Sequence, residues 1–211
     1  MKIIKAYNQV INESSDNLHL LTQEQIDWCN KHLLPNWEVN DNGEVHYNDS
    51  YIDILGDPYR FEVKFGTCTT FTCNSINLES LVGSPDKVLY DFIIDGSNIK
   101  TLEGAPEYVG DTLTLCDNIQ LTSLEGSPNT IERLRISDCD QLTNLKGLNT
   151  VDKSIAVHSC KSFNSLDGLS KEFNGQIYSR NCGLPQEELI YNWENDINQD
   201  DVNTFKSDWE I

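Results

Sequence analysis

The chain has 211 residues, and its 34 acidic side chains against 15 lysines and arginines give a formal net charge of −19. This charge opposes binding to nucleic-acid phosphates and to anionic membranes, and it favours basic partners. The sequence has no run of 18 apolar residues to span a bilayer, and its seven cysteines include no CxxC pair typical of a disulfide framework. We therefore expect that the chain neither inserts into a membrane nor binds nucleic acid directly, and that it resides in a reducing cytosol.

Residues 1–13, MKIIKAYNQVINE, place apolar side chains at helical spacing. The segment resembles the capsid-targeting leader of internal head proteins in T-even-like phages, which a prohead protease cuts after an apolar–x–Glu sequence. That resemblance implies cleavage between Glu13 and Ser14, and docking of the leader on a scaffold helix. The alternative is an ordinary amphipathic helix that packs on the rest of the chain.

Residues 14–65 are expected to cap the array that follows them. Thr22 and Gln25 form a capping-box pattern at the start of a short amphipathic helix, IDWCNKHLL. The next stretch, WEVNDNGEVHY, predicts a hairpin that turns at Asn42-Gly43. It also places oxygen-bearing residues at several EF-hand positions, but no second helix follows. We interpret it as a hairpin turn and not as a calcium site.

Residues 66–185 repeat a leucine that is followed two residues later by a glycine, at intervals of 21 or 22 residues. Between these pairs, short runs of alternating apolar residues begin near 71, 92, 113, 134, 155 and 177, as expected for strands with one buried face. One unit cannot bury its apolar face alone, so the units must stack. The sequence predicts an α/β solenoid with a parallel sheet of about six strands. The leucine and glycine pairs are Leu81/Gly83, Leu102/Gly104, Leu124/Gly126, Leu145/Gly147 and Leu166/Gly168.

One side chain per unit is expected to point into the turn that follows the strand. We predict that the cysteines at this position are packing residues with unreactive thiols, because a column of thiols does not form the tetrahedral cage of a metal site. Cys116, by contrast, is predicted to lie on the exposed face and to react first. The predicted inward column is Ile76, Ser97, Asn118, Cys139, Cys160 and Cys182.

The unit IERLRISDCDQLTNLKGL resembles the leucine-rich repeat, and LTSLEGSP is similar to the repeats of proteins from large tailed bacteriophages. The resemblance covers residues 71–185, and the segment from Leu21 to Asp49 resembles the leader region of the same proteins. Ile76 and Ser97 depart from the Asn/Cys position of the repeat. The resemblance implies a leucine-rich-repeat-like protein of a tailed phage.

Residues 186–211 are predicted to close the other end of the array. PQEELIYNWEND predicts a helix after Pro185, with Leu189, Ile190 and Trp193 able to cover the last repeat. The chain beyond Asn195 is polar and acidic, and we expect it to fray.

The outward residues of the predicted strands form the candidate binding surface. The first strands place mostly threonine and aspartate there, whereas the later strands place arginine, histidine and tyrosine. Arginine and tyrosine are enriched at protein-binding hot spots. The alternative is that the arginines merely pair with Asp117, Asp138 or Asp140. The predicted protein-binding residues are Arg133, Arg135, His158, Tyr178 and Arg180.

The sequence lacks phosphate-loop, GxGxxG, HExxH and GxSxG motifs, and its four histidines are scattered. We expect no catalytic residue, cofactor or metal. The preferred hypothesis is a non-enzymatic protein-binding module of a tailed phage, whose partner is a phage structural protein or a host protein. The alternatives are an anti-defence inhibitor, whose acidic surface engages a nucleic-acid-binding host protein, and a structural virion protein. The expected location is the host cytoplasm, with a place in or on the virion left open.

Overall fold

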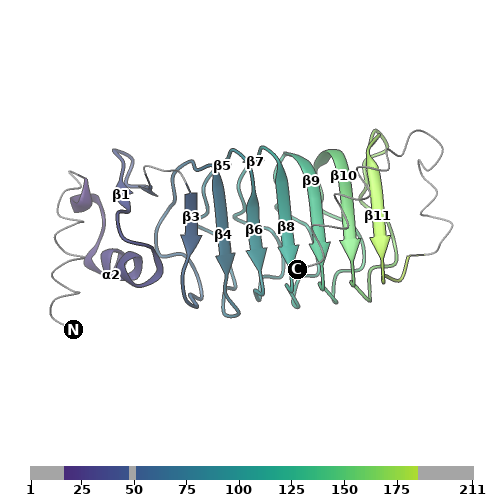
Figure 1. The fold of residues 1–211 in the computed structure, drawn as a ribbon, viewed down its shortest axis with the longest axis horizontal. Helices are drawn as coiled ribbons and strands as arrows, with labels where there is room; N and C mark the ends of the chain where they lie inside the picture. The colour runs from purple at the N-terminus through teal and green to yellow at the C-terminus, as the bar shows by residue number, and fades with distance from the viewer. Residues whose placement is uncertain (1–16, 48–50, 185–211) are drawn as a thin grey trace.

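The computed structural model describes residues 17–47 and 51–184, which form an elongated solenoid (Figure 1). Its main sheet runs in the order β3-β4-β6-β8-β9-β10-β11, and each neighbouring pair is parallel. The predicted parallel sheet is confirmed, and β3 adds one strand at its N-terminal edge. The strands are β3 (Tyr51–Ile54), β4 (Thr70–Asn74), β6 (Phe92–Asp95), β8 (Thr112–Cys116), β9 (Thr130–Ser137), β10 (Thr150–His158) and β11 (Gln176–Arg180).

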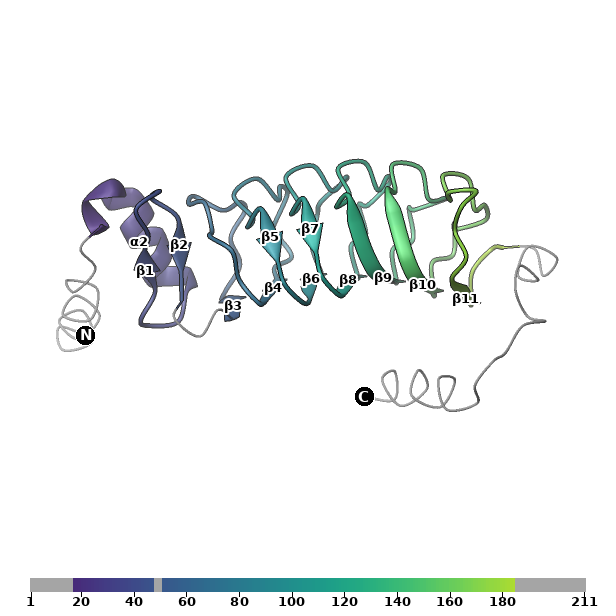
Figure 2. The ribbon, with the colours of Figure 1, turned by 90° about the horizontal axis from the view of Figure 1, so that it is seen from above.

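A second line of short parallel pairs joins the turns that precede β6, β8, β9 and β10. It contains β5 (Lys87–Val88) and β7 (Tyr108–Val109), and it continues into the first residues of β9 and β10. Those two strands are therefore longer than the others. Figure 2 shows the turns stacked along the long axis of the molecule. The turns from β5 to β10 thus pair with their neighbours along two lines, which keeps these units in register.

The inward side chains of the main strands form one continuous core. Phe71, Phe92, Leu113, Leu134 and Ile155 occupy equivalent positions, and each is fully buried. The predicted leucines of the turns, from Leu81 to Leu145, are also fully buried, and Leu166 is partly buried against the same core. The strands alternate because a period of two places every second side chain in this core.

The glycine after each turn leucine is required by the close approach of the preceding turn. Gly126 has a φ of +86°, and a Cβ at this position would lie 2.5 Å from the backbone nitrogen of Glu103. Gly147 has a φ of +88°, and its Cβ would lie 2.3 Å from the nitrogen of Glu125. Both the left-handed backbone and the lack of space exclude a side chain. The regular glycine spacing in the sequence therefore reports the stacking of turns.

The inward column of the turns is confirmed for five of its six predicted members. The exception is Ile76, which is 64% exposed, while Ser75 is buried in its place. In the other five turns, a residue with left-handed φ precedes the inward one and adds one position. The register equivalent of Gly96 in the first turn is Ser75, which lacks a positive φ and is itself the buried residue. The left-handed residues are Gly96, Asp117, Asp138, Ser159 and Asn181.

The inward side chains satisfy backbone groups of the preceding turn. Asn118 Oδ1 accepts a bond of 3.1 Å from Ser97 N, and its Nδ2 donates to Ile94 O at 2.9 Å. Further along, Cys139 N donates to Cys160 Sγ at 3.4 Å. Buried backbone groups need such partners, which explains why this position takes small polar residues or cysteine.

The N-terminal cap contains a 3-10 helix, η1 (Leu18–Leu20), the helix α2 (Gln23–His32) and the hairpin β1 (Glu38–Val39) and β2 (Val45–His46). The predicted capping box is present, since Thr22 Oγ1 accepts from Gln25 N and Gln25 Oε1 accepts from Thr22 N. The hairpin turns through Gly43, which has a positive φ. Val45 forms a parallel bridge to Phe65, so the hairpin continues the hydrogen bonding of the solenoid.

Several predictions fall outside the described residues. They are the leader of residues 1–13, the cleavage site at Glu13 and Ser14, and the C-terminal helix and acidic tail of residues 186–211. Within residues 17–47 and 51–184, no helix is long and apolar enough to cross a bilayer.

Candidate functional site

The outward residues of the main sheet lie in three rows that run across the strands, and together they form the surface that we call the sheet face. From β3 to β11, the middle row consists of Asp53, Thr72, Ile93, Thr114, Arg135, Ala156 and Tyr178. The row toward the strand ends contains Asn74, Asp95, Cys116, Ser137, His158 and Arg180. The row toward the strand starts contains Thr112, Arg133, Ser154 and Gln176, with Asp91 next to Thr112.

The charges of the sheet face are separated along the solenoid. Asp53 lies on β3, and Asp91 and Asp95 lie at β6; we call these three carboxylates the acidic half. The arginines lie on β9 and β11, and we call them, with His158 and Tyr178, the basic half. None of the outward residues of β4 and β8 is a carboxylate or a cation. The basic half consists of Arg133, Arg135, His158, Tyr178 and Arg180.

The five predicted binding residues are brought together on three consecutive strands. Arg135 and Tyr178 share a row and are separated only by Ala156, whose small side chain is buried. His158 and Arg180 are direct register partners. Strands of one sheet lie about 4.8 Å apart, so the two strand spacings from β9 to β11 place the arginines of β9 about 10 Å from Tyr178.

Arg133 is partly neutralised within its own chain. Its guanidinium forms an ion pair with Asp111 and lies 3.7 Å from a carboxylate oxygen of Glu132. The pairing partner is therefore not one of the three aspartates considered from the sequence. Of those, Asp140 binds Lys161 Nζ at 2.7 Å. An ion pair at a half-exposed site contributes only modestly to the free energy of folding. A guanidinium has five N–H donors, so Arg133 can also bind an acceptor on a partner.

Tyr178 and His158 are oriented by local hydrogen bonds. The hydroxyl of Tyr178 donates to Gln176 Oε1 on the same strand. His158 Nδ1 lies 3.0 Å from the hydroxyl oxygen of Ser159. Both rings are thus held before any partner binds, which lowers the entropy cost of using them in an interface.

Two carboxylates of the acidic half lie where their ionised forms are disfavoured. Burial raises the pKa of Asp53, and burial, with the nearby charge of Asp117, raises the pKa of Asp95. Asn74 Nδ2 donates a hydrogen bond of 3.1 Å to Asp95, and hydrogen bonds from Cys116 and from the backbone of Gly96 partly offset the rise of its pKa. A raised carboxyl pKa means that the ionised form is disfavoured where it lies. A cation placed over the acidic half would therefore stabilise these carboxylates.

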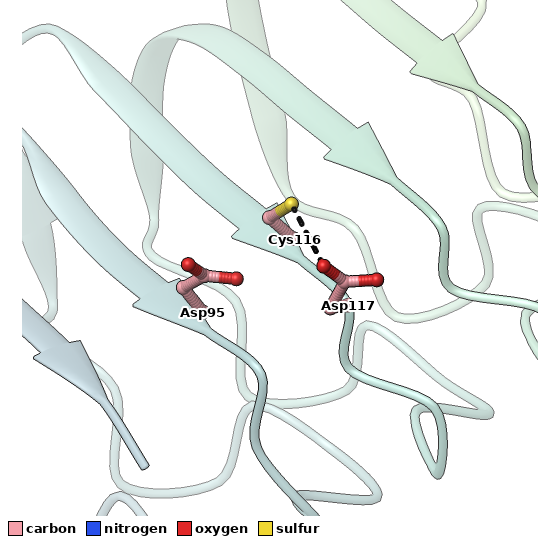
Figure 3. Close-up of side chains that lie close together, drawn as sticks. All are labelled: Asp95, Cys116 and Asp117. Carbon is pink, nitrogen blue, oxygen red and sulfur yellow. Dashed lines mark hydrogen bonds between the residues drawn. The ribbon is translucent and has the colours of Figure 1, made fainter. Parts of the chain in front are cut away.

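A group that sequence analysis missed lies at the edge of the acidic half. Asp95, Cys116 and Asp117 have ligand atoms within 4.8 Å of one another (Figure 3). Ser137 Oγ donates to Cys116 Sγ at 3.0 Å, and burial raises the pKa of Cys116 to about 11. A metal would therefore have to displace a thiol proton. Exposed carboxylates gather in this way without a metal, and we assign none here.

The placement of Cys116 on the sheet face agrees with its predicted position, and it is half-buried. All seven cysteines are free thiols. Burial raises the pKa of Cys29, Cys68 and Cys73 to about 12. The hydrogen bond with Cys160, followed by burial, raises the pKa of Cys139, whereas the same bond lowers the pKa of Cys160. The thiols with a raised pKa hold their protons at neutral pH, where only the thiolate is nucleophilic.

A cavity of about 550 Å³ lies where the cap meets the first turn, and sequence analysis gave no sign of it. Trp28, His32 and Tyr59 line it, together with lysine, arginine and carboxylate side chains. His32 Nδ1 lies 2.8 Å from Leu55 O, so this ring is committed to joining the cap to the solenoid. The mixture of opposite charges around the cavity favours no single class of ligand.

Comparison with protein-family models, with curated proteins and with solved structures finds no match for this chain.

Proposed function

We propose that the chain is a non-enzymatic protein-binding module, in which the basic half of the sheet face contacts the partner. The observation that carries the proposal is the concentration of cations on this surface. The sequence contains four arginines, and three of them, Arg133, Arg135 and Arg180, lie on the sheet face of a chain with net charge −19. A local positive patch on an acidic molecule gives a partner one electrostatically distinct place to bind.

The chemistry of the patch favours an acidic partner surface that also offers an apolar or aromatic contact. Arg135 and Arg180 supply charge-assisted hydrogen bonds, while Tyr178 supplies a rigid ring at low entropy cost. Arg135 and Tyr178 flank the buried Ala156 in one row, so the charge and the ring can contact the same partner surface. We extend the proposal to the tailed-phage setting that the repeat resemblance implies, with a phage structural protein or a host protein as the partner.

The experiment compares capture from a bacterial lysate by immobilised protein and by three variants. We expect the double variant Arg135→Ala/Tyr178→Ala to lose the captured partner by about tenfold or more, as hot-spot truncations do. The matched control Thr72→Ala/Ile93→Ala changes the same row on the acidic half and should capture normally. The third variant deletes residues 196–211, which are acidic. If this deletion abolishes capture while the arginine and tyrosine variant captures normally, the basic half is not the binding site.

A further inference from the structure

The charge pattern of the sheet face is antisymmetric about its central strand. β8 lies in the middle of the seven main strands, and β6 and β9 flank it. Asp91 directly precedes β6 and Asp95 ends it, whereas β9 carries Arg133 and Arg135. At the ends of the sheet, β3 carries Asp53 and β11 carries Arg180. The strands between them, β4, β8 and β10, place threonine, serine, asparagine, alanine, cysteine and one histidine outward. Each carboxylate therefore has a cation at the mirrored strand.

We propose that the sheet face pairs with the sheet face of a second copy of this chain, across a twofold axis that lies along β8. This rotation reverses the order of the strands and keeps each row over the same row of the partner copy. Asp91 then faces Arg133 of the other copy, and Arg135 faces Ile93 between Asp91 and Asp95. Self-pairing goes beyond the proposed function, because it would cover the basic half until another partner displaces the second copy.

The charges select this axis over the other in-plane twofold. An axis along the rows would place β6 over β6 and β9 over β9, so that aspartates would face aspartates and arginines would face arginines. The axis along β8 avoids every such contact. It also places the uncharged strands over one another, since β4 faces β10 and β8 faces itself through Thr112, Thr114 and Cys116.

The second copy would place arginines near the aspartates of the acidic half. Asp53 and Asp95 have raised pKa values because they are partly buried, and a facing arginine would favour their ionised forms. Across the proposed axis, Asp53 faces Tyr178 with Arg180 in the adjoining row, and Asp95 lies diagonal to Arg135. Arg133 keeps its own partner, Asp111, and has further donors for Asp91.

The size of the face indicates a weak and reversible dimer. Seven strands about 4.8 Å apart, each offering about five residues at about 3.3 Å, give a face of roughly 450–500 Å². Two such faces bury about 1,000 Å², the lower end of the range for specific interfaces. At about 0.15 M salt the Debye length is about 8 Å, so contacting pairs persist while repulsion between the distant charges of two acidic chains is screened.

The test uses analytical ultracentrifugation of the full chain from about 1 μM to about 1 mM, a range that covers weak affinities. We expect the mass of the wild type to rise reversibly toward that of a dimer. The variants Asp91→Lys/Asp95→Lys and Arg133→Glu/Arg135→Glu should each be monomeric throughout. Mixed in equal amounts, they should form a one-to-one dimer, because every facing pair again has opposite charges.

Matched controls carry the same change of charge on exposed turns away from the face. They are Glu103→Lys/Glu125→Lys and Lys100→Glu/Lys171→Glu, and both should dimerise as the wild type does. Because Arg133 holds Asp111, a second charge-swapped pair, Asp95→Lys with Arg135→Glu, leaves that contact in place, and circular dichroism checks folding of every variant.

Three outcomes would overturn self-pairing. The first is a wild type that stays monomeric, with no dimer in the mixture of charge-swapped variants. The second is dimerisation that the face variants leave intact, which would place the interface elsewhere. The third is a chain that dimerises only after residues 186–211 are deleted, which would make this acidic segment the occupant of the face. None of these outcomes removes capture of another protein through Arg135 and Tyr178, so the two proposals fail separately.

Discussion

The two halves of the sheet face share one backbone and carry opposite charges. In β6 and in β9, the inward residues are large and apolar, Phe92 and Ile94 in one and Leu134 and Ile136 in the other, and all four are fully buried. The charged residues on the sheet face are Asp91 and Asp95 at β6, and Arg133 and Arg135 on β9. The inward positions therefore determine the solenoid fold, whereas the outward positions determine the charge of each half.

The sharpest way to break this separation is to truncate neighbouring residues on opposite sides of β9. Leu134→Ala should lower the free energy of unfolding by about 2–5 kcal/mol, because it opens a cavity in a fully buried position. Arg135→Ala should change it by less than about 0.5 kcal/mol, as for other surface positions. Urea denaturation of the two variants measures both values. Equal losses would mean that the face also determines the fold.

The second prediction concerns the turns that all units share. Gly126→Ala should cost about 1–3 kcal/mol for the left-handed backbone, with a further loss because the new Cβ would lie 2.5 Å from Glu103 N. The control is Gly96→Asn, at a position whose equivalents in later turns are Asp117 and Asp138. We expect this control to melt near the wild-type temperature. A tolerated Gly126→Ala would contradict the close stacking of turns.

The third and smallest effect separates carboxylates inside and outside the acidic half. Because burial raises the pKa of folded Asp95, its favourable contribution is present at low pH and is lost as the pH rises through the raised pKa. Asp95→Asn should therefore gain stability relative to the wild type between about pH 3, below the usual aspartate pKa of about 3.9, and neutral pH. Urea midpoints across this range measure the trend.

The control for Asp95 has the opposite sign. The hydrogen bond from Lys161 lowers the pKa of Asp140, so its contribution appears above the usual carboxyl pKa and is lost as the pH falls. Asp140→Asn should therefore lose stability relative to the wild type as the pH rises. If both variants followed the same trend, the acidic half would not differ electrostatically from the turns.

Much of the solenoid could be predicted because its signals are local and repeated. The spacing of leucine, glycine and alternating apolar residues located six strands and the buried column of the turns. Ile76 was misplaced because Ser75, the first-turn equivalent of Gly96, lacks the left-handed φ of the other turns, and the sequence gives no sign of this. β3 was missed because it lies ahead of the regular repeats, in a stretch without the leucine–x–glycine pattern.

The candidate site was predicted in composition but not in its pairing. Counting outward positions located Arg135 and Tyr178 on the same side of the sheet, because period-two alternation fixes which face a residue occupies. Alternation does not predict which carboxylate pairs with Arg133. Asp111 lies 22 residues earlier in the sequence and comes next to Arg133 only because of the strand register. The same reason hides the group of Asp95 and Cys116, whose residues come from adjacent turns.

The most direct measurement of the central claim, that the basic half binds the partner, is arginine-selective labelling of the captured complex followed by mass spectrometry. The chain has four arginines, so Arg60 on the turn near the cap serves as an internal reference for Arg135 and Arg180. The account predicts that the partner protects Arg135 and Arg180 from labelling while Arg60 labels as in the free protein. Full labelling of Arg135 and Arg180 in a complex that protects Arg60 would contradict it.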